Sequence, residues 1–153
     1  MDRNTEIEQY WQDFLNAEGL DKSLRYKECF HFDLTEANAN ALLELVLQGQ
    51  KKATASSLHY FEGIGEPLPE KGDYSIITDW AGTPKCVIRT TQVTVRPFRE
   101  ITWEMAKREG EDESLESWQR GHVKFFTAEG KAEGYVFSEE MPVVFEDFEV
   151  AWQ

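Results

Sequence analysis

Cysteine, positive charge and long apolar runs are all scarce in this sequence of 153 residues. Its two cysteines form no CxxC pair, so we expect no disulfide framework, and Cys29 with His31 makes a poor zinc site without further ligands. The N-terminus is charged, and no stretch approaches the roughly 20 apolar residues of a membrane span. These absences exclude a disulfide scaffold and predict a cytoplasmic protein with no membrane partner.

Basic residues are outnumbered by acidic ones. The chain has 29 Asp and Glu against 16 Lys and Arg, which gives a formal net charge of −13. Such a field repels nucleic acid, so duplex DNA is not an expected partner, and only a local basic patch would override the average. No GxGxxG motif follows a predicted strand, which disfavours a dinucleotide-binding Rossmann unit.

The sequence does contain enough apolar surface for one core. Hydrophobic residues make up 41% of the chain and aromatic residues 13%, and no repeat or low-complexity linker divides it, so one main domain is expected. Apolar residues at helical spacing predict an amphipathic helix over residues 4–17. We assign residues 1–24 to a helical extension packed on the body and residues 25–153 to the main domain.

The rest of the chain alternates between the periodicities that mark strands and helices. In order, we expect a strand at 28–33, a helix from the cap Thr35 to Gly49, a short helical turn after 58, a strand within 68–80, a long strand at 85–98, helices at 101–110 and 114–130, and a closing strand at 141–153. Short, curving strands mixed with helices indicate an α+β fold, a small β-barrel or half-barrel with flanking helices and an N-terminal helix.

The segment GQKKAT, residues 49–54, places two lysines and a threonine directly after a predicted helix. If Lys51 and Thr54 serve one site, the chain at 49–52 must turn into a strand, with the lysine reaching back toward the hydroxyl. A neutral lysine would activate the threonine as a nucleophile, whereas a charged one would hold a phosphate or a developing oxyanion. Alternatively, the lysines only complement the dipole at the helix C-terminus.

A second candidate feature is an aromatic stripe on the helix predicted at 114–130. Trp118, His122, Phe125 and Phe126 recur at the spacing of a buried helix face. Core packing explains the aromatic residues. The imidazole of His122 needs a hydrogen-bond partner in such a stripe, and it is also a candidate for lining a cleft.

These segments together carry a family resemblance. GQKKAT fits the pattern Gly-x-Lys-x-x-Thr, and CVIRTTQVTVRPF, AKREGEDESLESWQRGHVKFF and MPVVFEDFEVAW follow in matching order. Over residues 25–152 the chain resembles the ASCH domain family, in its longer branch, which is related to the PUA-like RNA-binding fold. The resemblance implies a small PUA-like β-barrel whose cleft, beside the lysine motif, faces a nucleoside or RNA.

Two activities follow from this resemblance as expectations. A compact group of the family removes the acyl group from N4-acetylcytidine with a lysine, a threonine and a glutamate, and members of the longer group are described as ribonucleases. The implied catalytic residues are Lys51, Thr54 and Glu109, with no metal and no cofactor. One departure is Ser56, where the compact hydrolases have arginine. We interpret Glu111, Asp112 and Glu113 as acids that stabilise the following helix N-terminus.

Substrate-binding residues are expected around the lysine motif. The candidates are Lys52, Tyr60, Arg89 and His122. An aromatic ring such as Tyr60 would stack on a base for about 1–3 kcal/mol, or it would cap the core. Arg89, Arg96 and Arg99 with the two lysines would form a basic patch for a small or single-stranded ligand. Three functions therefore stay open: a metal-independent hydrolase, a non-catalytic RNA-binding module and a single-stranded ribonuclease.

Overall fold

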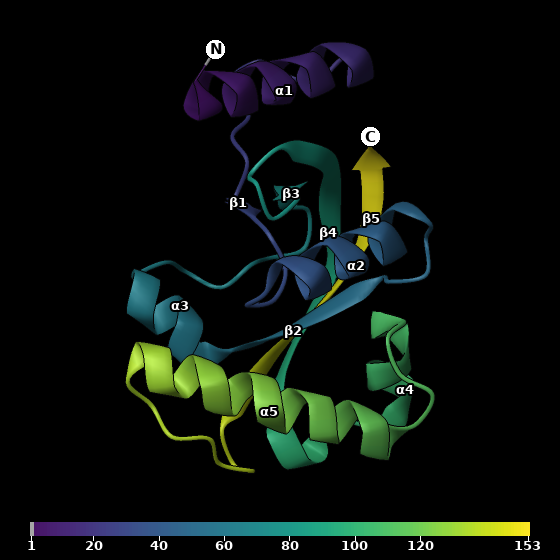
Figure 1. The fold of residues 1–153 in the computed structure, drawn as a ribbon. Coiled ribbons are helices and arrows are strands. Elements are labelled where there is room, and N and C mark those ends of the chain that lie inside the picture. The colour runs from purple at the N-terminus through teal and green to yellow at the C-terminus, as the bar shows by residue number, and fades with distance from the viewer. Residues whose placement is uncertain (1) are drawn as a thin grey trace.

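A curled five-stranded sheet with the order β1-β3-β4-β5-β2 forms the centre of the computed structural model, which describes residues 2–153 (Figure 1). The strands are β1 (Glu28–Phe30), β2 (Ala53–Ser57), β3 (Tyr74–Thr78), β4 (Pro84–Pro97) and β5 (Pro142–Trp152). β1 and β3 run parallel, and the other pairs are antiparallel. Register shifts within the long β4–β5 pair bend both strands. The predicted α+β half-barrel is confirmed.

Within residues 2–153, five helices surround this sheet. They are α1 (Arg3–Glu18), α2 (Glu36–Leu47), α3 (Leu58–Ile64), α4 (Trp103–Ala106) and α5 (Leu115–Glu133), with the 3-10 turns η1 (Phe98–Glu100) and η2 (Lys107–Glu109) on either side of α4. Thr35 and Thr102 cap α2 and α4 as predicted, since each hydroxyl accepts a hydrogen bond from a backbone N–H of the first turn. Within the described residues, no helix has both the length and the apolar character needed to cross a bilayer.

The strand predicted at 28–33 is shorter in the structure, where it ends at Phe30. Asp33 adopts a left-handed backbone conformation with φ 58°, and its carboxylate accepts a hydrogen bond from the N–H of Leu34 at 2.5 Å. Aspartate tolerates this conformation better than most residues. The chain therefore leaves the sheet here and turns into α2.

Both faces of the β3–β4 hairpin are covered. On one face Trp11, Phe14 and Leu15 of α1 pack against Ile76 and Val87. On the other face α2 packs against the alternate strand residues, with Leu43, Val46, Ile77, Cys86 and Ile88 in one buried cluster. A third cluster joins α4 and α5 to the N-terminal half of β5. Helices α2 and α5 thus lie on either side of β2 (Figure 1).

The segment between α2 and β2 is held on both sides by backbone hydrogen bonds. Gly49 has φ 80°, and the N–H groups of Gln50 and Lys51 both donate to the carbonyl of Leu45. The N–H of Lys52 donates to Arg108 in η2 at 2.9 Å. The structure thus confirms the turn into a strand that the lysine motif requires, and it fixes this turn against η2.

Gly110, which follows η2, makes the closest approach to this turn. Its φ is 72°, and a Cβ atom at this position would lie 2.3 Å from the carbonyl oxygen of Gln50. The side chain of Gln50 also donates to the Gly110 carbonyl at 2.7 Å. Only glycine fits this contact, and the contact sets the positions of the residues on either side of Gly110.

We expect Gly110→Ala to lower the melting temperature and the free energy of unfolding clearly. An alanine in this left-handed conformation is strained by about 1–2 kcal/mol. Its Cβ atom would also clash with the backbone carbonyl of Gln50, which the surrounding hydrogen bonds hold in place. Gly65→Ala is the matched control, because Gly65 has φ 69° and a Cβ atom there would have no neighbour within 4 Å. Chemical denaturation of both variants measures the difference, and equal losses would show that the contact with Gln50 is unimportant.

Tyr10 gives a second stability prediction. Its hydroxyl is buried without a hydrogen-bond partner among residues 2–153, while its ring lies 5.0 Å from that of Trp152. Tyr10→Phe should leave the free energy of unfolding unchanged or raise it by up to about 1–3 kcal/mol, the desolvation cost of an unpaired polar group. Tyr135→Phe should lower it, because the Tyr135 hydroxyl donates to buried Glu129 at 2.7 Å. Thermal unfolding that ranks the two variants in the opposite order would contradict this prediction.

Candidate functional site

A cleft of about 460 Å³ opens between α2 and α5, with β2 at its base. This volume lies in the range of about 300–1,000 Å³ that is usual for small-molecule sites. Lys51, Thr54, Glu109 and His122 all line it. The structure thus brings together the three residues expected to be catalytic and one of the residues expected to bind substrate.

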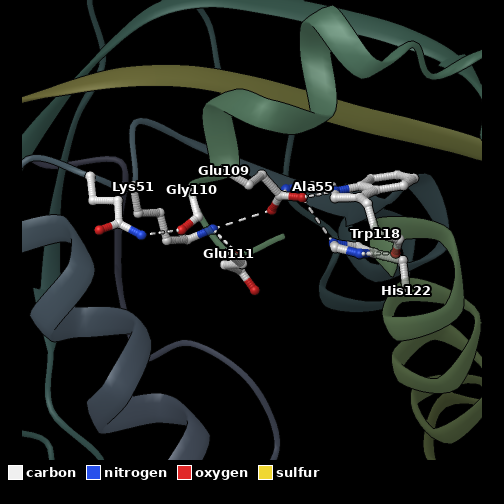
Figure 2. Close-up of polar contacts among 8 residues, drawn as sticks. Lys51, Ala55, Glu109, Gly110, Glu111, Trp118 and His122 are labelled. Atoms are coloured by element: carbon white, nitrogen blue, oxygen red, sulfur yellow. Dashed lines mark hydrogen bonds and ion pairs between the residues drawn. The ribbon is translucent and has the colours of Figure 1, made fainter. Parts of the chain in front are cut away.

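Lys51 is buried at the base of the cleft, with 2% of its surface exposed. Its Nζ donates to Glu109 Oε1 at 3.2 Å and to Glu111 Oε2 at 2.5 Å (Figure 2). Burial alone would lower the pKa of the Lys51 ammonium, but the two carboxylates outweigh it and hold the pKa above its ordinary value. Lys51 is therefore a cation bound by carboxylates, and it does not reach back as a neutral base toward Thr54.

Glu109 is the most heavily hydrogen-bonded residue of the site. Oε1 accepts from Lys51 and from the N–H of Ala55 at 3.2 Å, while Oε2 accepts from the indole of Trp118 and lies 2.9 Å from His122 Nε2. Burial raises the pKa of this carboxyl, but the charges of Lys51 and His122 outweigh it, and the pKa falls well below its usual range. Glu109 is a fixed anion that binds four donors (Figure 2).

Glu111 is the site residue that sequence reasoning missed. Its position suggests an acid that only stabilises the N-terminus of α5, but its side chain is 22% exposed, bonds Lys51 and lines the cleft. Burial and the nearby charge of Glu109 raise the pKa of this carboxyl, while Lys51 opposes the rise. The acidic run after Gly110 is a visible signal, but the sequence does not show which of its acids turns inward.

Three of the predicted substrate-binding residues lie elsewhere. Lys52 is exposed, Tyr60 lies on α3 with its ring against Phe61, and Arg89 lies on β4 with Glu149 at 3.7 Å. None of the three is among the residues that line the cleft. Arg99 is also paired with an acid, Glu140, at 2.7 Å. Of the arginines and lysines expected to form a basic patch, Lys51 alone lines the cleft, and Arg89 and Arg99 each face an acidic partner elsewhere.

The cleft lining is mixed in charge, with apolar walls. Its acidic residues are Asp33, Glu109, Glu111 and Asp112, and its basic residues are Lys51, His122 and Lys124. Phe32, Leu34, Ala41 and Leu42 line the α2 side, and Phe125 and Ala128 line the α5 side. Within residues 2–153 no three His, Cys, Asp or Glu side chains are grouped as a metal site. The arrangement suits a small, weakly charged molecule with an apolar part.

Comparisons with known proteins agree with this fold. The family model of the ASCH domain matches residues 28–151. A crystal structure of a protein from Enterococcus faecalis is 33% identical, with a TM-score of 0.89 over 97% of this chain and 89% of that chain. The ASCH domain from Lactobacillus crispatus is 30% identical, with a TM-score of 0.81 over 99% of this chain and 94% of that one. No curated protein matches. The chain belongs to the ASCH domain family.

Proposed function

We propose that this protein is a hydrolase that removes the acyl group from a small N-acylated nucleoside such as N4-acetylcytidine. One observation carries the proposal: a charged Lys51, the hydroxyl-bearing Thr54 and the partly exposed carboxyl of Glu111 line the same cleft. They are the three kinds of group that amide hydrolysis needs, namely an oxyanion stabiliser, a nucleophile and a proton carrier.

The environment of each group assigns its role. The ammonium of Lys51 would stabilise the negative charge that develops on the amide oxygen. Thr54 Oγ1 would attack the acyl carbon and pass its proton to Glu111, whose pKa is raised by burial, so that its carboxylate is a better proton acceptor than an ordinary glutamate. Glu109 keeps Lys51 charged and in place.

The bonds and protons balance over two steps. In the first, the new Oγ1–carbon bond forms, the carbon–nitrogen bond breaks, and Glu111 returns the proton to the departing amine. In the second, water attacks the acyl ester of Thr54, releasing the carboxylic acid and restoring the hydroxyl. No step calls on a group beyond the side chains of the cleft, the substrate and water.

Charge favours a nucleoside over an RNA strand. The cleft carries four acidic against three basic side chains, and the chain has a net charge of −13. A phosphodiester backbone would meet repulsion both in the cleft and in the approach to it. A neutral amide substrate meets no such barrier, and the apolar walls provide contact for a base and an acyl group.

Thr54→Val is the first test, because it removes the hydroxyl and keeps the shape of the side chain. We expect release of cytidine from N4-acetylcytidine, followed by chromatography, to fall by more than about 10³-fold, as for loss of a nucleophile. Ser56→Ala is the matched control, two residues along the same strand, and it should keep parental activity. Parental turnover by Thr54→Val would remove Thr54 as the nucleophile.

The same preparation distinguishes the two remaining functions. A labelled single-stranded RNA should remain intact and bind weakly. Shortening of this RNA would favour a ribonuclease, and tight binding that weakens steeply with salt, without cleavage, would favour an RNA-binding module. Either result, with no hydrolysis of acylated nucleosides, would overturn the proposed function.

Glu111→Gln tests the proton carrier. A base acts in its ionised form, so parental activity should rise with pH through the raised pKa of Glu111. The variant should lose about 10²-fold or more in kcat together with this acidic limb of the pH profile. Glu113→Gln, a change at a neighbouring exposed acid, should keep the parental kcat and the acidic limb of the pH profile. An unchanged acidic limb in Glu111→Gln would assign the proton transfer to another group.

A further inference from the structure

His122 is placed between two oxygen atoms, and both act as hydrogen-bond acceptors. Its Nδ1 lies 2.8 Å from the carbonyl oxygen of Trp118, and its Nε2 lies 2.9 Å from Glu109 Oε2. A carbonyl oxygen only accepts, and Glu109 is held as an anion by its other donors. A neutral imidazole has one donor and one acceptor nitrogen, so either tautomer would direct a lone pair at an oxygen. Only the doubly protonated ring satisfies both contacts.

We propose that His122 is a charged imidazolium throughout the neutral pH range and acts as a positioning residue for Glu109 and Lys51, so that loss of its proton sets the alkaline limit of the site. The protonation state stands on the geometry alone. The effect on activity rests on the proposed function. This role differs from the substrate contact expected from the sequence, since both ring nitrogens are already bonded within the protein.

The surroundings of the ring support the charge. The side chain is 13% exposed and stacks on the indole of Trp118 with ring centroids 4.0 Å apart. The charged groups that face it are Glu109 in η2 and Glu111 after Gly110, with Lys51 on the far side of both carboxylates. Burial lowers the pKa of His122, but the charge and hydrogen bond of Glu109 outweigh it and raise the pKa above the ordinary value.

The cluster is neutral as a whole only while His122 is charged. Lys51 and His122 balance Glu109 and Glu111, so loss of one proton leaves a buried net negative charge. The neutral ring would then direct a lone pair at Glu109 Oε2 or at the Trp118 carbonyl, and Glu109 would keep only the hydrogen bond from Trp118 as its full-strength contact with α5. Because Glu109 orients Lys51, the ammonium would lose its position in the cleft.

The sign of the pH effect follows from the raised pKa. The stabilisation from His122 is fully present below the ordinary histidine pKa of about 6.5 and is lost as pH rises through the higher value in the folded protein. Activity should therefore fall as His122 loses its proton, at a higher pH than that at which an ordinary histidine does so.

Nitrogen-15 NMR of the histidine side chains tests the protonation state directly. The chain has three histidines, and the signals of His122 are identified by their loss in His122→Gln. At pH 7.5 both of its ring nitrogens should show imidazolium shifts, while His31 and His59, which lie outside the cleft lining, provide the comparison. A neutral His122 ring at this pH would overturn the proposal, and it would leave the hydrolase assignment untouched.

The activity test uses His122→Gln with His59→Gln as its control. Glutamine can donate to Glu109 but carries no charge, so kcat should fall by about 10–100-fold, the range typical of groups that orient a directly acting residue, with KM little changed. The alkaline limb of the pH profile should disappear in His122→Gln and stay in His59→Gln. A folded His122→Gln variant that keeps the parental limb would overturn the positioning role, and if that variant does not fold, the NMR result on the parent still decides the protonation state.

Discussion

The burial of the Glu109 charge is the constraint on which the rest of the site depends. A carboxylate with 2% exposure is stable only if donors replace the water it has lost. Those donors come from two separate parts of the chain: Lys51, just before β2, with Ala55 in β2, and Trp118 with His122 on α5. Satisfying one carboxylate therefore fixes the distance between β2 and α5, and with it the base of the cleft.

The sequence predicted the parts of this arrangement that depend on local pattern. The alternation in β4 and β5 and the helical stripes of α2 and α5 gave the α+β half-barrel, because these elements are long enough for their periodicity to be clear. The i, i+4 spacing of Trp118 and His122 places both side chains on one face of α5, where both reach Glu109. The lysine motif and its family resemblance located Lys51, Thr54 and Glu109.

What the sequence did not predict depends on contacts between distant segments. The charge state of Lys51 is set by Glu109 and Glu111, about 60 residues further along the chain. Glu111 turns inward because the left-handed turn at Gly110 lies against Gln50, and no local pattern shows this approach. The position of Arg89 depends on a distant contact as well: it lies directly opposite Glu149 in the β4–β5 register, which the sequence of either strand alone does not reveal.

Because Glu109 and Lys51 are buried together, not every substitution in the cleft can test catalysis without also changing stability. Removing the side chain of Lys51 would leave the buried carboxylate of Glu109 with His122 as its one charged partner among residues 2–153, and breaking such a buried pair costs about 3–5 kcal/mol. A loss of activity in a Lys51 variant would therefore combine a weaker fold with a lost oxyanion contact. Thr54 is half-buried and is not part of the ion cluster, so its hydroxyl can be removed without disturbing the charges. For this reason a substitution at Thr54, the nucleophile we propose, separates an effect on chemistry from an effect on stability, and a substitution at Lys51 does not.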